Sequence, residues 1–172
     1  MACKFLSLIH FLAGIYFICL LGCSPTPETT PEVGFESYFP IAIGTTELQL
    51  QVAVNPIEQA RGLMYREQLA PRHGMLFIFE TAQQRSFWMR NTPLPLDLAY
   101  INTKGAVVEF HRLYPYDEIP VLSRSHNIKF ALELQQGQIN FLGIQEGDRL
   151  DLKALARALA ARGLDPNKRL LH

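Results

Sequence analysis

Five side chains that suit ligand binding fall within ten residues of one another. They are Trp88, Arg90, Asn91, Thr92 and Asp97. An indole ring stacks on the faces of sugars or bases, and Arg donates a planar fork of hydrogen bonds to a carboxylate or phosphate. This stretch therefore predicts a surface that binds a polar or anionic ligand.

Two prolines make the backbone beneath these side chains stiff. Pro93 and Pro95 fix φ, lack an N–H group and push the preceding residues into extended geometry. We expect the chain to leave a sheet at Asn91 and to return to it near Leu96. The result is a rigid corner with Asn91 on one side and Asp97 on the other.

Two further arginines join the candidates because of an uneven charge distribution. Residues 28–58 hold five Glu and no Lys or Arg, whereas residues 61–90 hold five Arg and two Glu. Arg61 and Arg66 follow a predicted helix and complete the ligand-binding set. The formal net charge is zero, which gives no argument for nucleic acid as a partner. No motif indicates a cofactor.

Asp97 is expected to have a specific partner. It begins a strand on a face that it shares with apolar residues, where an unpaired carboxylate is costly. We predict a pair with Arg66 or, failing that, with Arg61. The alternative is hydrogen bonding to the donors of Asn91 and Trp88 across the corner.

Clustered methionines raise a soft-metal alternative. Met64, Met75 and Met89 are weak candidates for copper(I), which thioethers select. In a strand, however, Met89 points away from Trp88 and shares a face with Phe87. This alternation favours packing of Met against aromatic rings in a core, and no metal site is predicted.

A hydrolase is the second alternative, and the preferred interpretation is not an enzyme. Asp97, Glu133, His111 and His126 are the available acids and bases. The sequence fixes no distance between them, and it lacks a nucleophile elbow and zinc-binding His spacing. A non-catalytic binding or accessory module, with a small-molecule or protein ligand, is therefore favoured.

The N-terminus predicts export and lipidation. Residues 5–21 are almost wholly apolar, and Leu20–Leu21–Gly22–Cys23 resembles the end of a bacterial lipoprotein signal peptide. Residues 1–22 are then the signal peptide, and residues 23–34 are a Pro/Thr-rich tether. Lipid on Cys23 would anchor the protein in the cell envelope, and Ser24 favours the outer membrane, facing the periplasm. The alternative is an uncleaved membrane anchor.

Cysteine usage narrows the chemistry further. Cys3 and Cys19 lie within the predicted signal peptide, so the mature chain keeps only the lipidated Cys23. A disulfide and a catalytic Cys are both excluded by this interpretation.

Strand patterns dominate residues 35–164, which we interpret as one domain followed by a tail over residues 165–172. A hairpin with one solvated face is expected over residues 39–54, and residues 75–79 suit a strand buried on both faces. Further strands are expected at 96–101, 106–113 and 128–134. The fold class is mainly β, an antiparallel barrel or sandwich with short helices and a C-terminal helix and no βαβ alternation.

The first of those short helices has a clear start signal. Asn55 can cap it, Pro56 suits the first helical position, and Glu58 completes a capping box. We expect its buried stripe to be Ile57, Ala60 and Met64, with an end near residue 65.

Four sequence blocks resemble a known family. Arg61–Gly62–Leu63–Met64–Tyr65–Arg66, Gly74–Phe79, Phe87–Thr92 with Pro95–Leu96–Asp97, and Gly143–Asp148 occur in the order of the domain of unknown function 192 family. The likeness spans about 41–152. It implies a mainly β domain, often behind a signal peptide, and no established activity.

Overall fold

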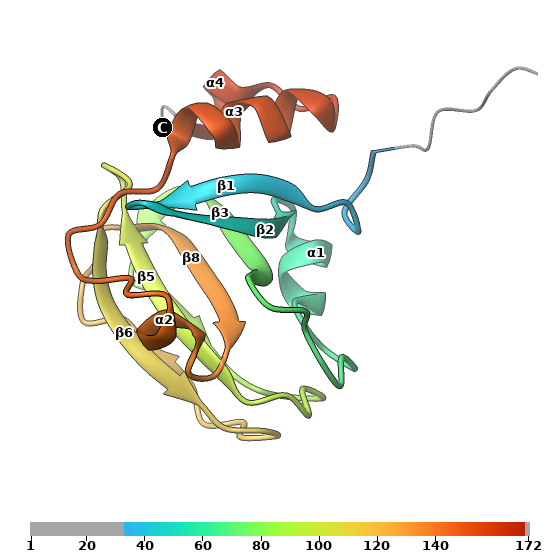
Figure 1. Cartoon of the computed structure of the whole chain (residues 1–172), viewed down its shortest axis with the longest axis vertical. Helices are drawn as coiled ribbons and strands as arrows, with labels where there is room; N and C mark the ends of the chain where they lie inside the picture. Colours follow the sequence, from blue (N-terminus) through green and yellow to red (C-terminus); the bar gives the residue numbers. More distant parts are fainter. Residues whose placement is uncertain (1–32, 171–172) are drawn as a thin grey trace, which may run out of the picture. The chain divides into compact units, whose positions relative to one another are not determined.

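The computed structural model describes residues 33–170, and the domain is mainly β, as predicted. Figure 1 shows a curved sheet with helices on both of its sides. The strands are β1 (Phe39–Ile43), β2 (Thr46–Ala53), β3 (His73–Gln83), β4 (Ser86–Phe87), β5 (Leu96–Asn102), β6 (Val107–Leu113), β7 (Val121–Leu122) and β8 (Ile128–Gln135). The helices are α1 (Pro56–Arg61), α2 (Gln138–Phe141), α3 (Leu152–Ala161) and α4 (Pro166–Leu170).

Six strands form one sheet in the order β1-β2-β3-β8-β5-β6, and β4 pairs with β7 in a separate small sheet. All neighbours in the large sheet are antiparallel except β2 and β3, which run parallel. A parallel pair needs a crossover, and α1 lies in it. The segment β2-α1-β3 is therefore a βαβ unit, and our prediction of no such unit was wrong there.

One face of the large sheet packs against the C-terminal helices. Leu155 and Leu159 of α3 are fully buried and belong to the same cluster as Leu76, Leu132 and Ile101 of the sheet. Asp151 caps α3 by accepting hydrogen bonds from the amides of Lys153 and Ala154. The predicted C-terminal helix is confirmed, and its buried face is made of Ala154, Leu155, Ala158 and Leu159.

The other face of the sheet carries a second core. Met75, Phe77 and Tyr100 point into it from the sheet, and Met89 and Leu94 close over it from the segment that follows β4. Because this core continues over β2, the hairpin has no fully solvated face. Gln51, predicted to face solvent, is buried.

Helix α1 begins as predicted but buries nothing. Asn55 and Glu58 form the full capping box, and Pro56 occupies the first turn. The helix ends at Arg61, and Ile57 is 83% exposed. The predicted apolar stripe was wrong because the segment after α1, not α1 itself, packs into the second core, through Leu63.

One short segment joins the two edges of the sheet. The Arg149 carbonyl accepts from the amide of Gly44, just after β1, and the Asp151 amide donates to the Ala42 carbonyl within β1. On the other side, the Val107 amide of β6 donates to the carbonyl of Asp148. Residues 147–151 thus contact β1 and β6 at one end of a sheet that is not closed.

Within residues 33–170, no helix is both long and apolar enough to cross a membrane. The predicted signal peptide, Cys23 and most of the tether lie outside the described residues. Residues 166–170, which we assigned to a tail, form α4.

Candidate functional site

Four of the seven predicted ligand-binding residues line one of two pockets on opposite faces of the sheet, and Arg66, Arg90 and Asn91 line neither. The first, called here the Trp88 pocket, has a volume of about 240 Å³ and lies between α1, the second core and the segment after β4. Its lining residues are Gln59, Ala60, Arg61, Gly62, Leu63, Met64, Phe77, Phe79, Ser86, Phe87, Trp88, Thr92 and Glu133. Three predicted ligand-binding residues, Arg61, Trp88 and Thr92, therefore meet at one cavity.

Glu133 supplies the one carboxyl group of this pocket. It lies on β8 opposite Leu98 of β5 and Met75 of β3, so it faces the second core. The residue is 4% exposed, and no hydrogen bond or ion pair between described residues involves its carboxyl group. Burial disfavours the charged form and raises the pKa of Glu133 to about 8. At neutral pH this carboxyl is mainly protonated and can both donate and accept.

Aromatic rings hold the pocket in shape. The ring of Phe87 meets the edges of Phe77 and Tyr100, with centroids 4.9 and 5.8 Å away. The Tyr100 hydroxyl donates to the Val121 carbonyl at 2.7 Å, which fixes β7 and hence its partner β4. The second core thus positions Phe87 and, next to it, Trp88.

Trp88 and Arg61 flank the opening. Trp88 is 47% exposed, and the guanidinium of Arg90 lies 5.6 Å from its ring centroid. Arg61 forms an ion pair with Glu36 at 2.9 Å. The opposite orientations that we predicted for Trp88 and Met89 are confirmed, since Met89 is buried in the second core.

The remaining candidates on this side have structural partners. Arg66 donates to Glu36 and to the Gln51 side chain, each at 2.8 Å. Asn91 has a positive φ of 54°, and its carbonyl accepts from Tyr65 at 2.8 Å. These contacts place Asn91 at the predicted corner and tie that corner to the segment after α1.

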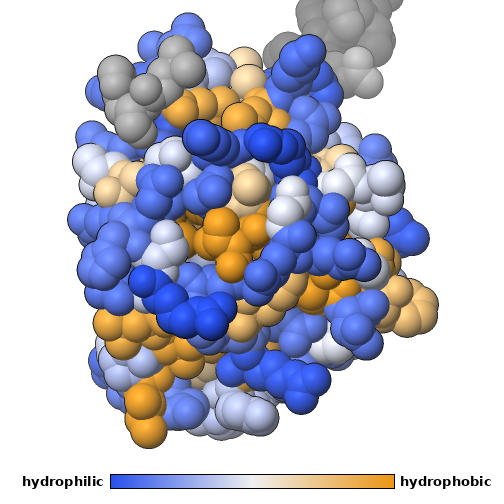
Figure 2. Space-filling view, turned by 90° about the vertical axis from the view of Figure 1, so that its left-hand side faces the viewer, coloured by the Kyte–Doolittle hydropathy of each residue, from blue (hydrophilic) through white to orange (hydrophobic). Residues whose placement is uncertain are grey.

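The second pocket contains Asp97 and lies on the face of the sheet that α3 covers. It has a volume of about 480 Å³, and we call it the Asp97 pocket. Figure 2 views the molecule from the side of β6 and shows hydrophobic surface near the centre of that face, ringed by hydrophilic side chains. The lining residues are Asp97, Phe110, His111, Arg112, Gly137, Ile139, Asn140, Ile144, Gln145 and Glu146.

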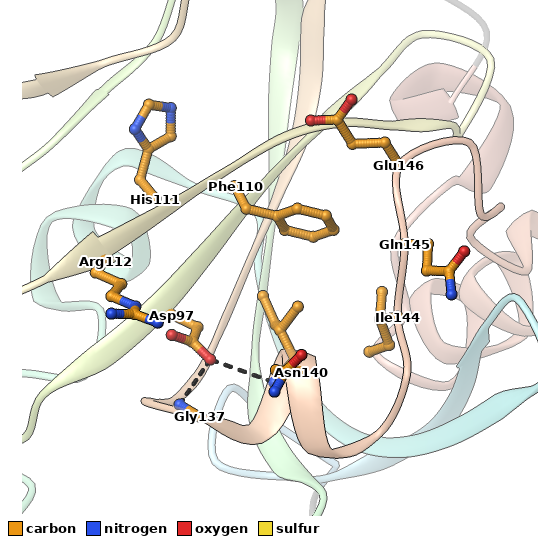
Figure 3. A pocket seen from close by; sticks show the side chains of 10 residues that line it. Asp97, Phe110, His111, Arg112, Gly137, Asn140, Ile144, Gln145 and Glu146 are labelled. Atoms are coloured by element: carbon orange, nitrogen blue, oxygen red, sulfur yellow. Dashed lines mark hydrogen bonds between the residues drawn. The ribbon is translucent and has the colours of Figure 1, made fainter.

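Asp97 has the specific partner that its position required, but not the predicted one. Its Oδ2 accepts hydrogen bonds from the Gly137 amide at 2.8 Å and the Ile139 amide at 3.3 Å (Figure 3). It therefore caps α2. The expected pairing with Arg66 or Arg61 was wrong because both arginines lie on the other face of the sheet.

The candidates for metal and acid–base chemistry do not converge. Met75 and Met89 are core residues, while Met64 lines the Trp88 pocket. No group of three His, Cys, Asp or Glu suited to a metal ion occurs among residues 33–170. His111 contacts Glu109 at 3.0 Å, and His126 is exposed in a loop. The chain places Asp97 and Glu133 on opposite faces.

The sequence contained one signal for Glu133 that our ligand-binding set did not use. Glu133 interrupts an otherwise apolar run in β8, at a position that shares a face with buried Ala131. A carboxyl group in such a run either forms a hydrogen bond or ion pair with a buried group or faces a cavity. Only the fold decides between these outcomes.

Two solved structures are similar to this chain. A Sinorhizobium meliloti 1021 crystal structure, named for a suggested transcription regulator, matches with 37% identity and a TM-score of 0.64 over 69% of this chain and 97% of its own. A Novosphingobium aromaticivorans DSM 12444 protein of unknown function matches with 31% identity and a TM-score of 0.62, over 66% and 84%. Among curated proteins, none is significantly similar. The family described as DUF192, Uncharacterized ACR, COG1430, matches residues 40–152, and this chain therefore belongs to that family.

Proposed function

We propose that this domain is a binding module for a small polar ligand, which enters the Trp88 pocket and contacts Glu133 at its base. The observation that carries the proposal is the carboxyl of Glu133. A largely buried carboxyl group that makes no hydrogen bond inside the protein remains available to a ligand that enters the cavity it lines. Within the described chain this group has no partner and lines an open cavity.

We prefer the Trp88 pocket over the larger Asp97 pocket because only the Trp88 pocket contains a buried carboxyl group without a protein partner in the described chain. The buried carboxylate of the Asp97 pocket already accepts two backbone amides. Arg61 and Arg66 each pair with Glu36, so neither guanidinium is without a carboxylate partner, and this weakens the case for an anionic ligand.

The sole tryptophan of the chain allows a direct test. Trp88 fluorescence should change saturably when the protein is titrated, to tens of millimolar, with small amines, amides, alcohols, sugars and carboxylates. At least one compound class should bind, and Glu133→Leu should weaken that binding at least tenfold. Arg112→Gln, on the rim of the Asp97 pocket, is the matched control and should bind like the wild type. No saturable change with any class, or equal binding by Glu133→Leu, would refute the proposal.

The cellular setting that we propose is an envelope membrane, with Cys23 as the lipid-carrying residue. Its support is the apolar segment before Cys23 and the tether-like composition after it. Labelling with a fatty acid should be lost in Cys23→Ala, and the variant should leave the outer-membrane fraction. Unchanged labelling and partition would contradict this localisation.

A further inference from the structure

The Trp88 pocket has an unbalanced set of ionisable groups. Of the residues that line it, only Arg61 and Glu133 carry ionisable side chains. Arg61 is more than half exposed to solvent and pairs with Glu36 at 2.9 Å, whereas Glu133 is buried and has no counter-ion within the described chain. The charge that a ligand would have to balance inside the cavity is that of ionised Glu133, and a positive ligand charge balances it.

The aromatic lining also suits a cation. Phe77, Phe79, Phe87 and Trp88 surround the cavity, and aromatic faces attract positive charge. Two of these rings already lie against a guanidinium group. Arg85 lies 4.0 Å from the Phe79 centroid, and Arg90 lies beside Trp88.

We infer that the Trp88 pocket recognises an alkylammonium group, with Glu133 as its counter-ion and the aromatic rings as its walls. This inference rests on the proposed binding function and names its ligand class. A volume of about 240 Å³ suits a side-chain-sized group rather than a large ligand. The hydroxyl oxygens of Ser86 and Thr92 are further acceptors in the lining for the other ammonium hydrogens.

Other ionisable groups on this face have their own partners. The Tyr100 hydroxyl donates to a backbone carbonyl, and burial, with the charges of Glu109 and Glu133, raises its pKa. His111 lies beside Glu109, with Leu98 between it and Glu133 across the sheet. Glu36 is held by two arginines. Lys129 lies on the same face of β8 as Glu133, donates to the Glu80 carbonyl, and burial lowers its pKa. A pH dependence of cation binding near pH 8 is therefore assigned to Glu133 by its loss in a Glu133 variant.

Matched four-carbon probes test the ligand class through Trp88 fluorescence. n-Butylammonium should bind, and n-butanol and butyrate should bind at least tenfold more weakly at pH 8. Because the cation needs the ionised carboxyl, its affinity should rise about tenfold per pH unit from pH 6 and level off above about 8. Glu133→Gln should weaken binding at least tenfold at pH 8 and abolish this pH dependence. His111→Asn should keep it.

A peptide with a single lysine separates the two sources of an alkylammonium group. Tighter binding than n-butylammonium indicates a protein partner, and equal or weaker binding indicates a free amine. If n-butanol binds best and its affinity falls above pH 8, the neutral carboxyl is the recognition group; the alkylammonium inference is then refuted, and the binding function stands. If none of these probes binds but another of the compound classes does, the alkylammonium inference alone fails; if no compound class binds, both proposals fail.

Discussion

Asp97 and Glu133 lie on neighbouring strands, β5 and β8, but one residue out of register, so their side chains project from opposite faces of the sheet. Asp97 is opposite Leu134, and Glu133 is opposite Leu98. The sheet itself separates the two carboxyl groups. They cannot act as an acid–base pair on one substrate, and each has its own role.

Glu133 should make stability depend on pH. Its pKa is about 8 in the folded chain and near 4.5 without burial, so the folded state holds a proton that the unfolded state has lost between these values. The free energy of unfolding therefore falls as pH rises through this window. Relative to wild type, Glu133→Gln should gain roughly 2–4 kcal/mol between pH 5 and pH 9. Urea denaturation at both values measures this, and parallel pH profiles would contradict it.

Asp97 should stabilise the fold by capping the start of α2. Asp97→Asn keeps an acceptor oxygen but loses its charge, and we expect it to cost about 1–2 kcal/mol. Asp97→Ala leaves the amides of Gly137 and Ile139 without their acceptor and should cost about 2–3 kcal/mol. Chemical denaturation gives both values, and ligand binding in the Trp88 pocket should be unaffected. Two variants as stable as the wild type would show that this cap is dispensable.

The buried methionines should behave as ordinary core residues. Met75→Leu and Met89→Leu conserve volume, and each should cost less than about 1.5 kcal/mol. Met89→Ala leaves a cavity and should cost about 2–5 kcal/mol. Isothermal titration with copper(I) should show no tight stoichiometric binding; such binding, lost in Met89→Leu, would revive the soft-metal alternative.

Arg162 should be essential although it lies at the end of a surface helix. Its guanidinium reaches Glu58 of the α1 capping box and also donates to the Val52 carbonyl, and both charged side chains are largely buried. Removing the guanidinium leaves the Glu58 carboxylate buried without a counter-ion. Arg162→Ala should therefore lower the free energy of unfolding by roughly 3 kcal/mol. Arg157→Ala, on the exposed face of the same α3, should stay within about 0.5 kcal/mol. Equal melting temperatures for the two variants would refute the difference.

The sequence predicted those features that depend on local patterns. Alternation located β5, β6 and β8, and the capping box located the start of α1. The alternation of side chains along a strand also predicted that Met89 points inward and Trp88 outward. Each of these follows from residues that are near neighbours in the chain.

Features that depend on which strands become neighbours were not predicted. Glu133 lines the Trp88 pocket only because β8 inserts between β3 and β5, which no local pattern encodes. The partner of Asp97 is a backbone amide, and every residue type except proline offers one. Gln51 is buried where Glu36 and Arg66, distant in sequence, form hydrogen bonds with its side chain. Long-range topology decides all three.

The segment at residues 147–151 has a consequence for the order of synthesis. It reaches the ribosome exit roughly a hundred residues after β1, yet it donates to and accepts from the chain beside both edge strands. Until it emerges, the nascent β-hairpin keeps one unsatisfied edge, the kind of surface that recruits chaperones or other chains.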